Sequence, residues 1–352
     1  MFSGIGGFRE GLTAAGNFVC VGHCEINAKA NRSYAALFDT EGEWFCADAT
    51  QADPDTMPEF ELLCGGFPCQ AFSIAGRRSG FGDPRGTLFF QLARLAAARH
   101  PRYLLFENVP GLLNHDGGRT FAAILTTLEG LGYHVEWQVL NSKDFGVPQS
   151  RLRVYIVGYL DERCRGKVFP FTTATIPAAL RPEPATPNSP VISIPIKEAT
   201  RKGYKRAYPG DSIDISYLTT NTRRGRVGHG VAHTLTTDCT QGTLCFVDMN
   251  EQPDCTAYAR CLTAKQGGFF HHHRREASGV LQEGRIRRLT PREYLRLQGW
   301  RDKRIDRVLA VQPDSVVYQQ AGNGVTVTVI ETIGRRLTAM DAALREGGSL
   351  GT

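Results

Sequence analysis

Closely spaced cysteine pairs are absent from this sequence. Its ten cysteines are scattered singly, without a Cys-x-x-Cys motif, which argues against a disulfide scaffold or a zinc ribbon. Three adjacent histidines at residues 271–273 do not indicate a metal site either, because neighbouring side chains point in different directions and no paired ligand spacing accompanies them. We therefore expect a protein without a bound metal that functions in the reducing cytoplasm.

Long apolar runs and a strong charge excess are also absent. No apolar stretch approaches the roughly 20 residues of a membrane-spanning helix, and residues 1–7 have neither the basic nor the apolar zone of a signal peptide. The formal net charge is +6, which is compatible with a polyanionic partner but too small to separate a nucleic-acid-binding protein from a basic enzyme. We expect no membrane partner. Because the net charge does not identify the function, the sequence motifs are needed for that.

What the sequence does contain is a chain long enough for two lobes. Its 352 residues exceed the roughly 250 to 300 at which a single core stops growing. Alternating apolar runs and helical patterns from residue 17 to about 160 predict an α/β fold with a doubly wound, mostly parallel sheet. Seven prolines between residues 170 and 195 exclude a regular helix there and place a lobe boundary near residue 165. The candidate strands are residues 19–21, 45–47, 62–64, 103–106, 137–140 and 154–157, and the candidate helices are residues 88–99 and 120–131.

The stretch from residue 200 to 288 has a different texture. It is rich in Thr, Gly, Arg and His and short of long apolar runs, as expected of irregular β structure whose surface serves recognition. A weak internal echo lies within it, because residues 232–236 (Ala-His-Thr-Leu-Thr) recur as residues 259–263 (Ala-Arg-Cys-Leu-Thr). Two copies are too few for a solenoid.

Polar or reactive side chains follow four of the candidate strands. Glu25, Asp48, Cys69 and Glu107 come shortly after these apolar runs. Because ligands of doubly wound sheets bind beyond the carboxyl ends of the strands, we expect the four side chains to line one crevice. The glycine-rich residues 2–8 precede a helical pattern, which suits the approach of a ligand to a helix N-terminus. With Glu25 as an acceptor for ribose hydroxyls, this pattern indicates a nucleoside-type cofactor.

Cys69 is the candidate nucleophile. It follows a Gly-Gly-Phe-Pro run at a strand tip, where a thiol lies close to backbone amides and can ionise. A small buried cysteine is the commoner reading of such a residue, but Glu107 supplies a carboxyl group and Arg151 and Arg153 supply two guanidiniums. This combination suits nucleophilic addition to an electron-poor ring with proton delivery to the ring nitrogen.

The order of these segments resembles that of the DNA cytosine-5 methyltransferases over nearly the whole chain. The resemblance implies an S-adenosylmethionine-dependent methyltransferase fold. It also implies a catalytic and cofactor-binding domain of residues 1–165 plus 318–352, and a smaller, irregular β-rich domain of residues 166–317 that contains the target recognition region. The segments similar to the family's motifs are residues 2–8, 48–50, 67–70, 85–90, 107–109, 149–153, 288–293, 297–299 and 320–325.

The resemblance also implies a mechanism. A cytosine is flipped out of the duplex, because its ring atoms are unreachable in the stack, and Cys69 attacks C6 while Glu107 acts on the N3 side. Arg151 and Arg153 hold the base and the thiolate, and C5 takes the methyl group of S-adenosylmethionine. The residues expected to bind the cofactor are Phe2, Gly4, Gly6, Glu25, Ile26, Asp48, Ala49, Pro68, Leu88, Asn323 and Val325.

Contacts with DNA are expected in two places. Between Gln70 and Arg85 the chain resembles the loop that closes over the target base in this family, with hinge glycines and phosphate-facing arginines. A solvated loop would have the same composition, and only the position beside Cys69 favours this function. The basic runs at residues 223–226 and 285–288 bracket the recognition region and suit contact with the DNA backbone. The residues expected to bind DNA are Gln70, Ser73, Arg77, Arg78, Arg223 and Arg224.

One departure from the family's pattern concerns the N-terminus. Family members have an apolar strand directly before the Phe-x-Gly-x-Gly segment, whereas this segment begins here at Phe2. A missing strand would expose the neighbouring sheet edges and loosen the cofactor loop. The two explanations are a true start upstream of Met1, which we favour, and a shortened, weakened protein.

These observations lead to one main hypothesis and two alternatives. We expect a monomeric DNA (cytosine-5) methyltransferase that acts on double-stranded DNA, either beside a cognate restriction endonuclease or as a solitary bacterial or phage enzyme. The first alternative is methylation of cytosine in transfer RNA, against which the long insert between residues 165 and 285 argues. The second is a DNA-binding protein that has lost catalysis, against which the presence of Cys69, Glu107, Arg151 and Arg153 argues.

Overall fold

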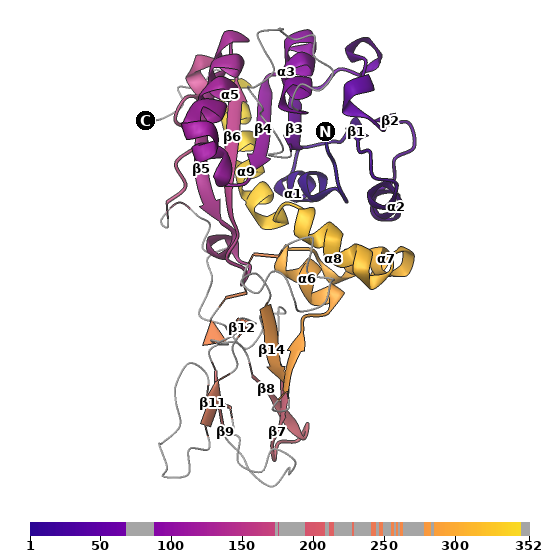
Figure 1. Ribbon diagram of the computed structural model, residues 1–352, viewed down its shortest axis with the longest axis vertical. Coiled ribbons are helices and arrows are strands. Elements are labelled where there is room, and N and C mark those ends of the chain that lie inside the picture. The colour runs from indigo at the N-terminus through magenta and orange to yellow at the C-terminus, as the bar shows by residue number, and fades with distance from the viewer. Residues whose placement is uncertain are drawn as a thin grey trace.

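An α/β region forms one end of the molecule and short strands form the other (Figure 1). Among the expected site residues, Pro68, Cys69, Gln70, Ser73, Arg77, Arg78, Arg223 and Arg224 lie outside the described part of the chain. The computed structural model describes residues 1–67, 88–172, 175, 194–207, 211–214, 227–228, 241–243, 246–248, 255–256, 258–259, 261–262, 278–282 and 285–345.

A four-stranded sheet forms the centre of the α/β region. Its strands lie in the order β3 (Leu62–Gly66), β4 (Tyr103–Asn108), β6 (Leu152–Tyr159) and β5 (His134–Asn141). β3 and β4 are parallel, whereas β6 runs antiparallel to both β4 and β5. β3, β4 and β5 therefore point the same way, and the reversed strand follows from the short connection between β5 and β6, which is compatible only with antiparallel pairing. Three of the four strands thus share one direction, which agrees with the expected fold class.

Helices cover both faces of this sheet. Leu104 and Phe106 of β4 pack with α3 (Leu88–Arg99) and α5 (Arg119–Gly130), and Tyr103 and Leu105 pack with α1 (Gly7–Ala15) and α9 (Val327–Arg345). The alternation arises because successive side chains of a strand point to opposite faces. Every residue of β4 is buried, which explains its unbroken apolar run before Glu107. The doubly wound architecture is confirmed, and α3 has the expected bounds.

A two-stranded parallel sheet lies beside the central one. It consists of β1 (Gly22–Cys24) and β2 (Trp44–Cys46). The expectation of a strand at residues 19–21 is wrong by three residues, because pairing with β2 starts at Gly22. The two strands approach closely there, since a Cβ atom at residue 22 would lie 2.9 Å from the Trp44 carbonyl oxygen. Val19, in the expected strand, is 86% exposed instead.

A cavity of about 640 Å³ separates β1 from β3 and is lined mainly by apolar side chains. Met1 and Ser3 are among the residues that line it. The Met1 amino group donates a hydrogen bond to the Cys64 carbonyl oxygen of β3 (2.8 Å), and the Ser3 N–H donates one to the Cys24 carbonyl oxygen of β1 (2.9 Å). Residues 1–3 thus bridge the two sheets at the position where the family resemblance predicts a further strand.

Helices α6 (Pro291–Leu297), α7 (Asp302–Val311) and α8 (Asp314–Asn323) lie between the α/β region and the distal strands (Figure 1). Thr290 starts α6 with a capping box, in which its side chain and that of Glu293 each accept from the other's backbone N–H. Trp300 and Ile305 share a buried cluster with Tyr34 of α2 (Ala28–Leu37), so these helices are fixed to the α/β region. The remaining short helices are α4 (Gly111–Asn114), η1 (Ala49–Gln51), η2 (Pro54–Thr56), η3 (His115–Gly118), η4 (Ser142–Phe145) and η5 (Glu162–Cys164).

Short antiparallel strands make up the distal end, as expected of an irregular β-rich region. They form three sheets with the orders β7-β8, β10-β9-β11 and β13-β12-β14-β15. The exact domain boundaries stay a prediction. The strands are β7 (Ile194–Lys197), β8 (Tyr204–Ala207), β9 (Ser212–Asp214), β10 (Val227–Gly228), β11 (Gln241–Thr243), β12 (Phe246–Asp248), β13 (Cys255–Thr256), β14 (Ser278–Gln282) and β15 (Arg285–Arg288).

Candidate active site

The carboxyl ends of β3 and β4 lie side by side. Gly66, the last residue of β3, pairs with Glu107 of β4. The next residue, Phe67, is buried, and its carbonyl oxygen accepts a hydrogen bond from the Asn108 side-chain amide at 2.9 Å. The chain is therefore fixed beside Glu107 up to Phe67, two residues before Cys69. Cys69 itself lies outside the described residues.

Glu107 has a buried carboxyl group that faces Arg153. The Arg153 Nε atom lies 3.0 Å from Glu107 Oε1, with side-chain exposures of 14% and 12%. Burial raises the pKa of Glu107 above its usual value, although the positive charges of Arg153 and Arg151 act in the opposite direction. A carboxyl group with a raised pKa can keep its proton until it is delivered to a reacting group.

The absence of a side chain at Gly66 leaves room for this carboxyl group. A Cβ atom there would lie 3.0 Å from Glu107 Oε2, a distance at which the carboxylate would have to move. The glycine at the end of β3 therefore has a steric role in the site.

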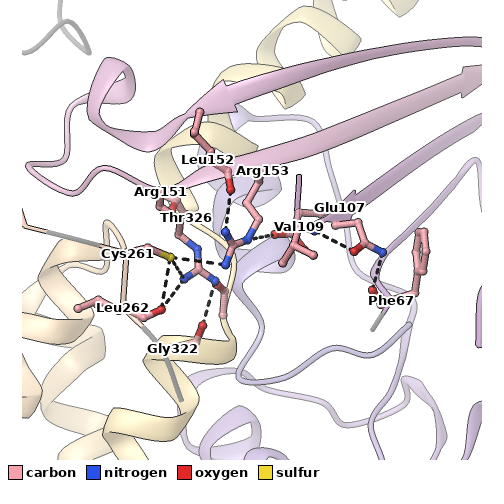
Figure 2. A network of polar contacts seen from close by, with 12 residues as sticks. Phe67, Glu107, Val109, Arg151, Leu152, Arg153, Cys261, Leu262, Gly322 and Thr326 are labelled. Atoms are coloured by element: carbon pink, nitrogen blue, oxygen red, sulfur yellow. Dashed lines mark hydrogen bonds and ion pairs between the residues drawn. The ribbon is translucent and has the colours of Figure 1, made fainter. Parts of the chain in front are cut away.

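Arg151 joins three segments of the chain (Figure 2). Its side chain is buried, and its two terminal nitrogens donate hydrogen bonds to the carbonyl oxygens of Leu262 (2.9 Å), Gly322 (2.9 Å) and Gly324 (2.8 Å). Burial lowers the pKa of Arg151, and the nearby charge of Arg153 lowers it further. Arg151 thereby holds β6, the Leu262 segment and the turn after α8 together.

The cofactor end of the expected crevice is built around Glu25. Its two carboxylate oxygens accept hydrogen bonds from the backbone N–H groups of Gly4 (2.7 Å) and Asn27 (2.8 Å). Gly4 and Gly6 have φ angles of 54° and 91°, a conformation that favours glycine. The next side chain, Ile26, is 73% exposed. A carboxylate, a glycine-rich backbone and an exposed apolar side chain thus lie together, and the carboxylate oxygens can accept further hydrogen bonds.

Asp48 and Ala49 lie beside this group. The Glu25 N–H donates to the Cys46 carbonyl oxygen at 3.3 Å, which joins the turns that follow β1 and β2. Asp48 begins η1 and accepts a hydrogen bond from the Thr50 N–H at 2.9 Å, while Ala49 is buried. The two acids expected to bind the cofactor, Glu25 and Asp48, therefore follow paired parallel strands.

The other expected cofactor residues that the structure describes lie at the glycine-rich start, at the start of α3 and around the end of α8. Phe2 is half-buried with a φ of 53°, and Leu88 is the first residue of α3. Asn323 is exposed at the end of α8. Val325 packs closely on Gly7, because a Cβ atom at residue 7 would lie 2.8 Å from the Val325 side chain. The turn after α8 is thus held against the glycine-rich start.

Sequence reasoning missed two features of the site. The first is the role of Asn108, expected only as part of the segment 107–109, whose side chain fixes Phe67 beside Glu107. The second is the pair Cys261 and Leu262, which contacts Arg151 and Arg153. Its only signal was the weak repeat with residues 232–236, and a repeat does not say what a segment touches.

Two negative findings concern the described residues alone. They contain no group of three or more His, Cys, Asp or Glu side chains placed to hold a metal ion. None of their helices is long and apolar enough to span a membrane.

Known proteins resemble this chain over most of its length. The family model described as C-5 cytosine-specific DNA methylase matches residues 1–339. The type II methyltransferase M.NlaX of Neisseria lactamica is 34% identical over 98% of this chain and 97% of its own length. The orphan methyltransferase M.SPRI of Bacillus phage SPR is 29% identical over 96% of each chain. The crystal structure of S. pombe Dnmt2 methyltransferase matches with a TM-score of 0.60 at 18% identity, over 97% of each chain, and so shares the fold.

Proposed function

Because the chain belongs to the C-5 cytosine-specific DNA methylase family, we propose that it methylates C5 of a cytosine flipped out of duplex DNA. The observation that supports this proposal most directly is the buried Glu107–Arg153 pair at the end of β4. It lies beside the end of β3, from which the chain leads to Cys69. A proton donor beside a nucleophile is what addition to a cytosine ring requires.

Cys69 and Glu107 carry the proposed addition step. The Cys69 thiolate adds to C6 of the flipped cytosine, and Glu107 gives its proton to N3, so that electron density moves to C5. Arg153 then stabilises the carboxylate that Glu107 becomes, because its guanidinium lies 3.0 Å away. Loss of the C5 proton to a base breaks the bond between C6 and sulfur, and N3 returns its proton to Glu107. S-adenosylmethionine supplies the methyl group that C5 receives.

The two arginines have different parts in this proposal. Arg153 faces Glu107, whereas the terminal nitrogens of Arg151 donate to backbone carbonyls. We therefore assign direct stabilisation of the catalytic carboxylate to Arg153. Arg151 keeps β6 and the turn after α8 in register.

The proposed cofactor site lies where the carboxyl ends of the paired strands β1 and β2 meet. Glu25 would accept hydrogen bonds from the ribose hydroxyls, and Ile26 would cover the adenine ring. Asp48 would face the amino group of the adenine. Gly4 and Gly6 allow the backbone to approach the ligand, and Ala49 leaves space for it. Phe2, Pro68, Leu88, Asn323 and Val325 complete the proposed cofactor set.

Duplex DNA is the proposed substrate. Gln70, Ser73, Arg77 and Arg78 are proposed to contact it near the flipped base, and Arg223 and Arg224 along its backbone. The relatives include a type II and an orphan enzyme, so both settings, with and without a partner endonuclease, are compatible with the proposal.

Expression in a host without cytosine methylation tests the function. We expect 5-methylcytosine at one short duplex sequence throughout the host genome. A Cys69→Ala variant should leave the genome unmethylated, whereas Cys20→Ala, which changes a half-buried cysteine near β1, should not. Methylation confined to transfer RNA, or none with the folded wild-type protein, would contradict the proposal.

A further inference from the structure

The Cys261 sulfur contacts both arginines of the site (Figure 2). This sulfur atom accepts hydrogen bonds from Arg151 Nη1 at 3.4 Å and from Arg153 Nη2 at 3.7 Å. The thiol in turn donates to the Leu262 carbonyl oxygen at 3.6 Å. One sulfur atom is therefore both acceptor and donor at the centre of this network. The contacts with described residues do not require it to be a nucleophile or a metal ligand.

The residues on both sides of Cys261 are hydrogen-bonded to the segment directly before β6. Ala259 forms a parallel bridge with Gln149, and the Ser150 N–H donates to the Ala259 carbonyl oxygen at 2.9 Å. The Leu262 N–H donates to the Gln149 side-chain oxygen, also at 2.9 Å. Ala259 and Leu262 are fully buried. Contacts of Ala259 before Cys261 and of Leu262 after it therefore fix the position of the sulfur atom.

Arg153 is held at three points. Its Nε atom faces Glu107 at 3.0 Å, its Nη1 atom donates to the Leu152 carbonyl oxygen at 2.7 Å, and its Nη2 atom donates to Cys261. The guanidinium is planar, so contacts at separate nitrogens fix its orientation as well as its position. Leu152 belongs to the same strand as Arg153, whereas Cys261 lies in the sequence between β13 and β14 of the distal region. The sulfur contact therefore links that region to the arginine that faces the catalytic carboxyl group.

We propose that Cys261 is a positioning residue whose sulfur holds Arg153 against Glu107, so that the seating of the distal β-rich region controls the catalytic carboxyl group. This inference rests on the proposed function. It differs from a packing role, because it depends on hydrogen bonding by the side chain at position 261 and not on its volume.

Two substitutions separate these roles. Cys261→Ser keeps a group that can donate to the Leu262 carbonyl oxygen and accept from both arginines, whereas Cys261→Ala keeps neither ability. We expect Cys261→Ala to lower kcat about tenfold with a nearly unchanged KM for DNA, as the loss of a charge-assisted hydrogen bond predicts. Cys261→Ser should stay within about threefold of the wild type. Cys20→Ala, a half-buried cysteine elsewhere, serves as the matched control.

A second measurement does not depend on turnover. The Arg153 Nε–H signal in ¹⁵N NMR should report an ordered side chain in the wild type and in Cys261→Ser, and a mobile one in Cys261→Ala. Wild-type kcat in Cys261→Ala, or equal losses in Cys261→Ala and Cys261→Ser, would overturn the inference. If the wild-type protein methylates no cytosine, the proposed function fails. The NMR comparison then tests the positioning role by itself, and an ordered Arg153 side chain in Cys261→Ala would overturn that role.

Discussion

Burial gives the carboxyl group of Glu107 its chemical character. The side chain is removed from water and lies beside Arg153, and its pKa is raised because desolvation outweighs the two nearby positive charges. An exposed glutamate would be ionised near neutral pH and could not supply a proton. The same position lets Arg153 stabilise the anion once the proton has left.

Substitution of Glu107 by glutamine tests this role. The amide of the Glu107→Gln variant would keep a hydrogen-bond donor of similar size but could not transfer a proton, so we expect kcat to fall at least about 100-fold. DNA affinity, measured by fluorescence anisotropy, should change little. Glu43→Gln is the control, because Glu43 also pairs with an arginine, Arg9, at 2.7 Å with low exposure, yet has no part in the proposed chemistry. Equal activity of the two variants would contradict the role of Glu107.

The pH dependence of the rate offers a second test on the same carboxyl group. The proposed step needs protonated Glu107, so single-turnover rates should fall as pH rises through its pKa. Arg153 lowers that pKa, and Arg153→Met should therefore move the descending limb of the profile to higher pH, besides reducing the maximal rate. Among the described residues, Arg151 also lowers this pKa by its charge, and the substitution leaves Arg151 in place. If the descending limb of the Arg153→Met profile stays at the same pH or moves to lower pH, a group other than Glu107 controls the rate.

At the level of elements, the site depends on the ends of β3 and β4 lying in register. Gly66 and Glu107 pair directly, and a Cβ atom at residue 66 would lie 3.0 Å from Glu107 Oε2. Gly66→Ala should therefore displace the carboxyl group, destabilise the fold by about 1–3 kcal/mol and reduce kcat. Gly130→Ala is the matched control, because a Cβ atom at residue 130 would meet nothing within 4 Å. Gly130 is the last residue of α5, where alanine favours the helix. Calorimetry and a methylation assay measure both effects, and an unchanged kcat in Gly66→Ala would refute the steric argument.

The sequence predicted most elements of the α/β region because their apolar patterns follow local rules. The run at residues 103–106 proved to be the buried strand β4, and residues 88–99 proved to be α3. The first strand was misplaced because Val19 and Val21 look like strand residues, whereas pairing with β2 depends on Gly22. The Cys261 contacts were beyond reach, since they join residues more than 100 positions apart.

At the scale of the whole molecule, the cavity between β1 and β3 leaves a large apolar space inside the α/β region. An apolar, strand-forming extension fused to Met1 should enter it, because the Met1 nitrogen already donates to Cys64 of β3. Burial of several aliphatic side chains should stabilise the fold by at least about 2 kcal/mol and tighten cofactor binding through the glycine-rich turn. A Gly-Ser extension of equal length is the control. The same Tm for both extensions would show that the cavity does not accept a strand.

Covalent trapping tests the central claim, catalysis by Cys69 with Glu107 as its partner, most directly. Duplex DNA that carries 5-fluorocytosine cannot lose the C5 substituent as a proton, so the bond between sulfur and C6 should persist after methyl transfer. We expect a denaturation-resistant protein–DNA adduct that needs S-adenosylmethionine and maps to Cys69 by mass spectrometry. The adduct should be absent in Cys69→Ala and strongly reduced in Glu107→Gln. An active protein that forms no adduct, or one attached to another residue, would contradict the account.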